Sequence, residues 1–269
     1  MIQKNSSLAA KIWYIAYPFL FYYAVMLTVM TVAQWIFGSG NEHFVTCQLV
    51  ATLVTIPFMM PFYRQDQALL GIERRTPKFT SEKGLTVLWV IAAAALIGIG
   101  LDNIISMSPL VELSAGYQEA NAGFYGGTLV MELLSSALFT PILEELVFRG
   151  ILFPRLKALL PLRAAVVGSS LLFALMHFNI VQFVYALLLG IVLALFADRG
   201  GNVCYAVFGH MTINLLAVLR TETGLLSATV QGNTFSWVIS GAVLAVGVLL
   251  FIVFLKKNVE KDSKCNKKI

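Results

Sequence analysis

Long apolar runs separated by short polar stretches dominate this sequence. A helix that crosses a lipid bilayer needs about 20 mostly apolar residues, because the hydrocarbon core is about 30 Å thick. About eight runs approach or exceed that length, and they cover residues 12–37, 44–63, 85–105, 128–153, 164–178, 181–197, 203–219 and 235–255. The sequence therefore predicts an all-α, polytopic integral membrane protein with about eight transmembrane helices and the lipid bilayer as its surroundings.

The composition excludes the water-soluble classes of protein. Hydrophobic residues make up 58% of the chain and charged residues only 12%, whereas about 25% of an ordinary soluble chain is charged. The chain therefore has roughly half the charge that a soluble surface requires.

The basic residues predict how the helices are oriented. A formal net charge of +5 could indicate nucleic-acid binding, but basic residues also collect on the cytoplasmic loops of membrane proteins. If the N-terminus lies in the cytoplasm, every basic residue except Arg220 falls on the cytoplasmic side. We therefore expect both termini in the cytoplasm and no nucleic-acid partner.

The segments between and before the runs carry no recognisable chemistry. The first apolar run exceeds the about 7–15 residues of a signal-peptide core, so it is expected to be a retained anchor. A charged cytoplasmic loop is expected over residues 64–83 and a glycine-rich outer loop over residues 109–127. The 3 cysteines contain no C-x-x-C pair, which indicates neither a disulfide framework nor a cysteine zinc site.

Ionisable residues within the predicted spans mark a candidate buried polar site, because such residues are costly in a bilayer. Glu145 and Arg149 are four residues apart, so they share a helix face and can pair. Glu144 points about 100° away from its neighbour and has no such partner, which leaves its carboxylate available as a base. The alternative is that all three groups lie in water at the cytoplasmic end of the helix.

Two histidines occur in later spans. His177 follows Phe173 by four residues, and a lone histidine of this kind is more often a core group than a ligand. His210 and Asn214 share a face that could hydrogen-bond a substrate carbonyl or a metal-bound water, although Asn214 could instead bridge helices. Glu144 and His210 lie near the middle of their runs and could meet in one cavity. His177 would join them only if its helix were tilted or displaced.

The three motifs, in this order, resemble those of a known family. They are E-E-x-x-x-R at residues 144–149, F-x-x-x-H at 173–177 and H-x-x-x-N at 210–214. The set is similar to that of the CPBP intramembrane proteases, also called ABI or CAAX protease-like, which include the type II CAAX prenyl proteases. We therefore expect three parts, namely N-terminal membrane helices of unassigned role over 1–127, a protease core over 128–218, and a last transmembrane helix with a basic tail over 219–269.

The resemblance implies hydrolysis of a peptide bond in a membrane-associated or lipidated peptide or protein. The implied catalytic residues are Glu144, Glu145, Arg149, His177, His210 and Asn214. Glu144 would be the general base and His177 would hold or polarise the water. His210 and Asn214 would stabilise the oxyanion, the acid–arginine pair would fix the helix geometry, and Phe173 would pack beside His177.

The resemblance leaves the cofactor open. The family is often described as a metalloprotease family, and Glu144, His177 and His210 are candidate ligands of a zinc ion. However, no H-E-x-x-H motif is present, and water activated without a metal explains the same residues equally well.

The substrate and two alternative functions also stay open. Bacterial members of the family are associated with peptide-pheromone processing, bacteriocin immunity and protein sorting, so we expect the bacterial cytoplasmic membrane as the location. A non-catalytic scaffold or immunity protein would be favoured by a lost motif residue, and none is lost. A proton-coupled transporter would predict inverted repeats, and the sequence has no internal repeat.

Overall fold

The protein is helical throughout the residues that the computed structural model describes, which are 6–70 and 81–266. In chain order the elements are α1 (Leu8–Phe37), α2 (Asn41–Leu69), α3 (Ser81–Ser106), α4 (Ala115–Phe124), α5 (Leu129–Glu132), the π-helix η1 (Leu133–Phe139), α6 (Thr140–Val147), the π-helix η2 (Phe148–Leu152), α7 (Phe153–Leu159), α8 (Leu162–Leu175), α9 (Ile180–Gly200), α10 (Val203–Thr223), the 3-10 helix η3 (Ser227–Val230) and α11 (Thr234–Asn266). These described residues contain no strand, so the predicted all-α class is confirmed.

Six of the described helices are long and apolar enough to cross a membrane, namely α1, α2, α3, α9, α10 and α11. A seventh span results if α4 and the helix over Leu129–Leu159, which meet at an angle of 108°, are taken as one. The chain is therefore a polytopic integral membrane protein, as predicted, but with six or seven spans of sufficient length instead of about eight.

The difference between eight and seven comes from the predicted span over residues 164–178, and a count of six also leaves out the predicted span over 128–153, which belongs to the bent pair. The segment over 164–178 forms α8, which has only 14 residues. The helix ends because Phe178 has a left-handed backbone with φ 54°, and because the side chain of Asn179 caps the next helix by accepting a hydrogen bond from the backbone nitrogen of Gln182 at 2.9 Å.

The loops differ from the prediction in detail. Helix α2 continues to Leu69, so the first part of the predicted loop over residues 64–83 is helical. Residues 71–80 of that loop lie outside the described residues. The predicted outer loop over 109–127 contains the ten-residue helix α4.

The helix from Leu129 to Leu159 changes its winding twice, at η1 and at η2. Each π-helical segment is followed by a proline. Pro141 comes after η1 and Pro154 after η2, with one residue between the segment and the proline in each case. Proline has no backbone N–H and cannot continue the regular hydrogen-bond ladder. π-Helical turns of this kind often occur at functional sites. Helix α6, which lies between the two π-helical segments, carries Glu144 and Glu145.

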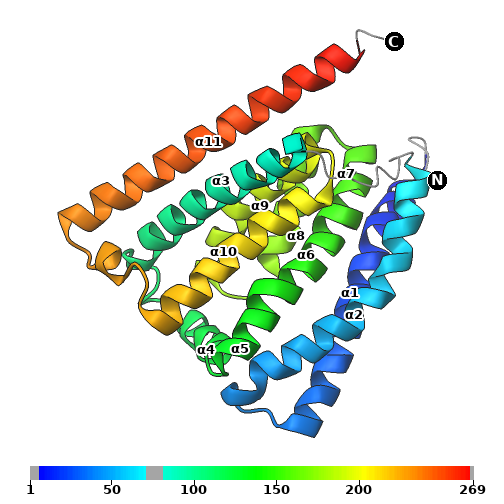
Figure 1. The fold of residues 1–269 in the computed structure, drawn as a ribbon. Coiled ribbons are helices and arrows are strands. Elements are labelled where there is room, and N and C mark those ends of the chain that lie inside the picture. The colour runs from blue at the N-terminus through cyan, green and yellow to red at the C-terminus, as the bar shows by residue number, and fades with distance from the viewer. Residues whose placement is uncertain (1–5, 71–80, 267–269) are drawn as a thin grey trace.

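The helices pack around two larger apolar cores that share α9, beside a smaller core that includes Phe153 and Ala194. One core joins α3, α9, α10 and α11, and includes Ile97, Leu193 and Phe196. The other joins α1, α2, α6, η2, α8 and α9, and includes Phe148 and Phe173. Figure 1 shows α11 lying along α3 on one side of the molecule and the α1–α2 hairpin on the opposite side, with both chain termini toward the same end. The cytoplasmic location of that end stays a prediction.

A buried ion pair connects the α1–α2 hairpin to the rest of the protein. Arg155 on α7 donates two hydrogen bonds to Asp66 on α2, with distances of 2.6 Å from Nε and 3.0 Å from Nη2. It also donates to the backbone oxygen of Tyr14 at 2.6 Å and to the hydroxyl of Tyr17 at 2.9 Å, both on α1. Only 1% of Arg155 is exposed, so its charge is buried among α1, α2 and α7, and its place on the cytoplasmic side stays a prediction.

A second polar cluster connects three helices near the opposite end. Arg220 on α10 pairs with Asp102 on α3 and donates to Asn103 Oδ1 at 2.7 Å. Asn103 in turn donates to Ser240 on α11 at 3.1 Å and to Thr229 at 3.0 Å. Polar side chains that bond across helices in this way fix how α3, α10 and α11 pack.

Candidate active site

The candidate site lies where α6, η2, the end of α8 and α10 meet. Glu144 and Glu145 come from α6, Arg149 from η2, and His210 from α10. These four side chains are in direct contact through three ion-pair distances of 2.7, 2.8 and 3.6 Å. Residues that are 65 positions apart in the chain are therefore brought together at one point in the apolar interior.

The centre of the site is a buried ion pair. Arg149 Nη1 donates to Glu145 Oε1 at 2.7 Å, and both side chains are 0% exposed. The guanidinium also donates from Nη2 to the backbone oxygen of Gly190 at 3.1 Å. A Cβ atom at position 190 would lie 3.0 Å from the Cβ of Ser170. The lack of a side chain at Gly190 therefore permits the close approach of Arg149 and Ser170 to the backbone of α9. The alternative in which Glu145 and Arg149 lie in water is therefore wrong.

His210 bridges the two glutamates. Its Nδ1 lies 2.8 Å from Glu145 Oε1, and its Nε2 lies 3.6 Å from Glu144 Oε2. Because the ionised Glu145 can only accept, Nδ1 must carry the proton. In the neutral ring Nε2 is then a free acceptor that faces Glu144.

Glu144 differs from Glu145 in exposure and in hydrogen bonding. Its side chain is 20% exposed, compared with 0% for Glu145. Within the described part of the chain its carboxylate accepts no hydrogen bond, and its one ion-pair contact is with His210 at 3.6 Å. One carboxylate is therefore held by the ion pair while the other stays accessible, which is the division expected from their positions on the helix.

His177 reaches the site through an aromatic contact. It lies directly after α8, and its Nδ1 is 3.1 Å from the backbone oxygen of Phe173, which leaves Nε2 as the free ring nitrogen. The Phe173 ring makes edge contacts with both imidazoles, at centroid distances of 5.1 Å to His177 and 5.7 Å to His210. Because α8 is short, His177 stays near the site and shares the Phe173 ring with His210. Phe173 also packs against Arg149, whose guanidinium carbon is 4.6 Å from the ring centroid.

Asn214 lies one helical turn beyond His210 and contacts the backbone of η1. Its amide nitrogen donates to the backbone oxygen of Ser136 at 2.8 Å. That oxygen lacks a helical donor, because the N–H of Thr140 bonds to Ser135 and Pro141 has no N–H. At least one N–H of Asn214 therefore bridges helices, and the other has no partner among residues 6–70 and 81–266, so it is open to a substrate.

The described residues contain no group of three His, Cys, Asp or Glu side chains placed to hold a metal ion. Of the three candidate ligands, Glu144 and His210 are neighbours, but the ring of Phe173 contacts both His177 and His210. The side chains as placed do not form the three-ligand set of a catalytic zinc site. The chemistry below is therefore assigned to the protein groups alone.

Tyr22 on α1 is a further neighbour of the site that was not predicted from the sequence. This residue is 7% exposed and packs edge-on against Phe148 with a centroid distance of 6.4 Å. It lies close enough to Glu144 to interact with it electrostatically. Tyr22 occurs in a long run of apolar and aromatic residues, where no spacing distinguishes it from a lipid-facing tyrosine.

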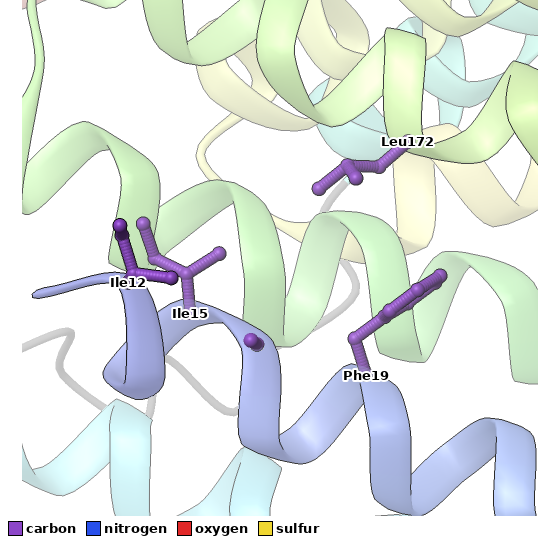
Figure 2. Close-up of a pocket in the computed structure, with 5 residues that line it drawn as sticks. Ile12, Ile15, Phe19 and Leu172 are labelled. Atoms are coloured by element: carbon purple, nitrogen blue, oxygen red, sulfur yellow. The ribbon is translucent and has the colours of Figure 1, made fainter. Parts of the chain in front are cut away.

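An apolar cavity of about 260 Å³ lies close to the site, between α1 and α8. Figure 2 shows Ile12, Ile15 and Phe19 of α1 facing Leu172 of α8 across this space. No ionisable side chain lines it, so it suits hydrocarbon and not the reaction itself.

Together, the fold and the site define a polytopic membrane protein with a buried glutamate–histidine–arginine centre. Residues 126–216 match the family model of the type II CAAX prenyl endopeptidases described as Rce1-like. The matched segment is about a third of the chain and contains all three motifs. The match confirms the resemblance to CAAX protease-like proteins and supports a protease-like function of that general kind. Neither the comparison with curated proteins nor that with solved structures gives a match.

Proposed function

We propose that this protein is an intramembrane endopeptidase that hydrolyses a peptide bond of a membrane-associated or lipidated peptide or protein. One observation carries the proposal. Glu144 is a partly exposed carboxylate beside His210, and His210 is held from its other side by the buried pair of Glu145 and Arg149. An imidazole that is fixed by one carboxylate and directed at a second acid–base group is suited to activating a nucleophile.

Glu144 acts as the general base. It takes a proton from a water molecule as the water oxygen forms a bond to the scissile carbonyl carbon, and the carbonyl electron pair moves onto oxygen. The tetrahedral intermediate then collapses and the C–N bond breaks while Glu144 returns the proton to the leaving nitrogen. The products are a carboxylic acid and an amine, and the enzyme is unchanged.

The other residues hold the reacting groups. His177 orients the attacking water through its free Nε2, because its Nδ1 is engaged by the Phe173 carbonyl. The Nε2 atom of His210 faces Glu144 and shares the proton that Glu144 takes from water. Asn214 directs its second amide N–H toward the oxyanion, and Glu145 with Arg149 positions the ring of His210.

We also propose that both termini face the cytoplasm of a bacterial cell. Five described basic residues near helix ends, Lys11, Arg64, Lys157, Arg163 and Arg199, belong to the starts of α1 and α8 and the ends of α2, α7 and α9, which the positive-inside rule would place on one side. Arg220, in the last turn of α10, is the exception. A C-terminal tag should be cleaved by protease in inside-out vesicles and protected in right-side-out vesicles. The reverse pattern would contradict this orientation.

The test of the proposed function compares membrane-associated peptides in cells that carry the wild-type chain, Glu144→Ala or His177→Ala, each present at equal amounts. Mass spectrometry should detect an uncleaved species that accumulates with both variants and is removed by the wild type. If both variants restore every effect of deleting the gene and no species accumulates, the protein acts as a non-catalytic scaffold, an immunity protein or a transporter.

A further inference from the structure

Helix α1 lies outside the segment that matches the endopeptidase family, yet one of its side chains points toward the candidate site. Tyr22 is 7% exposed, whereas the neighbouring Leu20 and Phe21 are 52% and 38% exposed. Tyr22 belongs to the apolar core that includes Phe148 and Phe173. The α1 helix therefore turns Tyr22 inward and its neighbours outward.

The contact with Phe148 brings the Tyr22 ring close to Glu144. Phe148 follows Glu144 by four residues, so the two side chains lie on the same face of their helix. Tyr22 packs on Phe148 at 6.4 Å and interacts electrostatically with Glu144. Within residues 6–70 and 81–266 the Tyr22 hydroxyl has no hydrogen-bond partner, and it is not among the fully enclosed unpaired polar atoms. The hydroxyl therefore keeps some accessible surface and is free to donate a hydrogen bond.

The site has few free hydrogen-bond donors for a developing oxyanion. Arg149 donates from Nη1 to Glu145 and from Nη2 to Gly190, and its Nε is enclosed. His210 directs its Nδ1 proton at Glu145, and Asn214 uses one N–H on Ser136. A tetrahedral oxyanion generally requires donors aimed at the oxygen as charge develops. A phenol beside Glu144 would supply one.

We propose that Tyr22 is a further catalytic residue, whose hydroxyl donates a hydrogen bond to the scissile carbonyl oxygen and holds it as it becomes the oxyanion. The phenol stays protonated throughout, so the proton balance at Glu144 is unchanged. This inference rests on the proposed endopeptidase function. It extends the active site to the first helix of the chain, which the three motifs do not include.

The test is Tyr22→Phe, which removes only the hydroxyl and keeps the ring against Phe148. The probe is a synthetic peptide with an S-farnesyl cysteine three residues from its C-terminus, added to the purified full-length protein in detergent micelles. We expect kcat to fall by about 100- to 1,000-fold, with KM and the thermal unfolding midpoint close to those of the wild type. A purely structural role would lower the unfolding midpoint and would not change kcat selectively.

Tyr23→Phe is the matched control, because Tyr23 is the adjacent tyrosine on α1 and packs near Phe178 at a ring distance of 6.5 Å. It should cleave the probe at the wild-type rate. If the wild type cleaves and Tyr22→Phe retains at least half its kcat, the role of Tyr22 is overturned and the proposed function stands. If the wild type itself does not cleave this probe, hydrolysis of this substrate class is overturned, and the role of Tyr22 with it.

Discussion

Glu144→Gln is expected to lower the rate of peptide cleavage by about 10³-fold, which is within the range for loss of a general base. Glutamine has nearly the same shape as glutamate but cannot take a proton from water. The structural effect should be small, because the Glu144 side chain is 20% exposed and is not part of the buried Glu145–Arg149 pair. The measurement is kcat and KM for the farnesylated peptide, together with the thermal unfolding midpoint of the variant.

Glu145→Gln is the informative comparison for this prediction. It removes the carboxylate that accepts from both Arg149 and His210, so an uncompensated guanidinium is left in the interior. We expect Glu145→Gln to lose both activity and thermal stability, whereas Glu144→Gln should lose activity alone. If Glu144→Gln cleaves within about tenfold of the wild-type rate, Glu144 is not the base and another group must activate the water.

Much of the fold could be predicted from the sequence, because the length of an apolar run directly limits what it can form in a bilayer. Each of the predicted runs corresponds to a helix in the structure. The run over 164–178 was the exception in length, since its end depends on the backbone of Phe178 and the cap at Asn179. The two π-helical segments were not predicted. Pro141 and Pro154 are visible in the sequence, but whether a proline ends, kinks or rewinds a helix depends on packing against its neighbours.

The candidate site was predictable where its residues are close in sequence. The four-residue spacing of Glu145 and Arg149 predicted a pair that the structure contains at 2.7 Å. Contacts between distant segments carry no such signal, and Tyr22 and the pairing of Asp66 with Arg155 could not be found in this way. The burial of Glu132 was not predicted either. This side chain is fully buried, and neither of its carboxylate oxygens has a hydrogen-bond partner among the described residues.

The catalytic roles of the six predicted residues stay predictions, and their geometry separates four of them into two kinds. Glu144 and His177 each keep a free acid–base atom. Glu145 and Arg149 are enclosed and act through His210. Variants of the first kind should therefore affect turnover, and variants of the second kind should affect turnover and folding together.

Arg155→Ala is expected to lower the free energy of unfolding by about 3–5 kcal/mol, because it leaves the carboxylate of Asp66 buried without its partner. Both side chains of this pair are 1% exposed. The guanidinium also stacks on Tyr14 and Tyr17, at 4.4 and 4.7 Å from their ring centroids. The variant should therefore loosen α1 and α2 from α7, and the measurement is thermal or denaturant unfolding of the purified protein in detergent micelles.

Arg163→Ala is the control for charge, because Arg163 is exposed at the start of α8, and it should change stability by less than about 0.5 kcal/mol. The double variant Asp66→Leu with Arg155→Met replaces the pair by apolar side chains and should recover most of the loss, since the main penalty is the unpaired buried charge. If Arg155→Ala alone is as stable as the wild type, the pair does not hold the hairpin.

Because α1 carries Tyr22, a loosened hairpin should also slow cleavage of the farnesylated peptide, and the double variant should restore cleavage together with stability. Recovery of stability without recovery of cleavage would show that the bidentate geometry of Arg155, and not only charge balance, sets the position of α1 relative to Glu144.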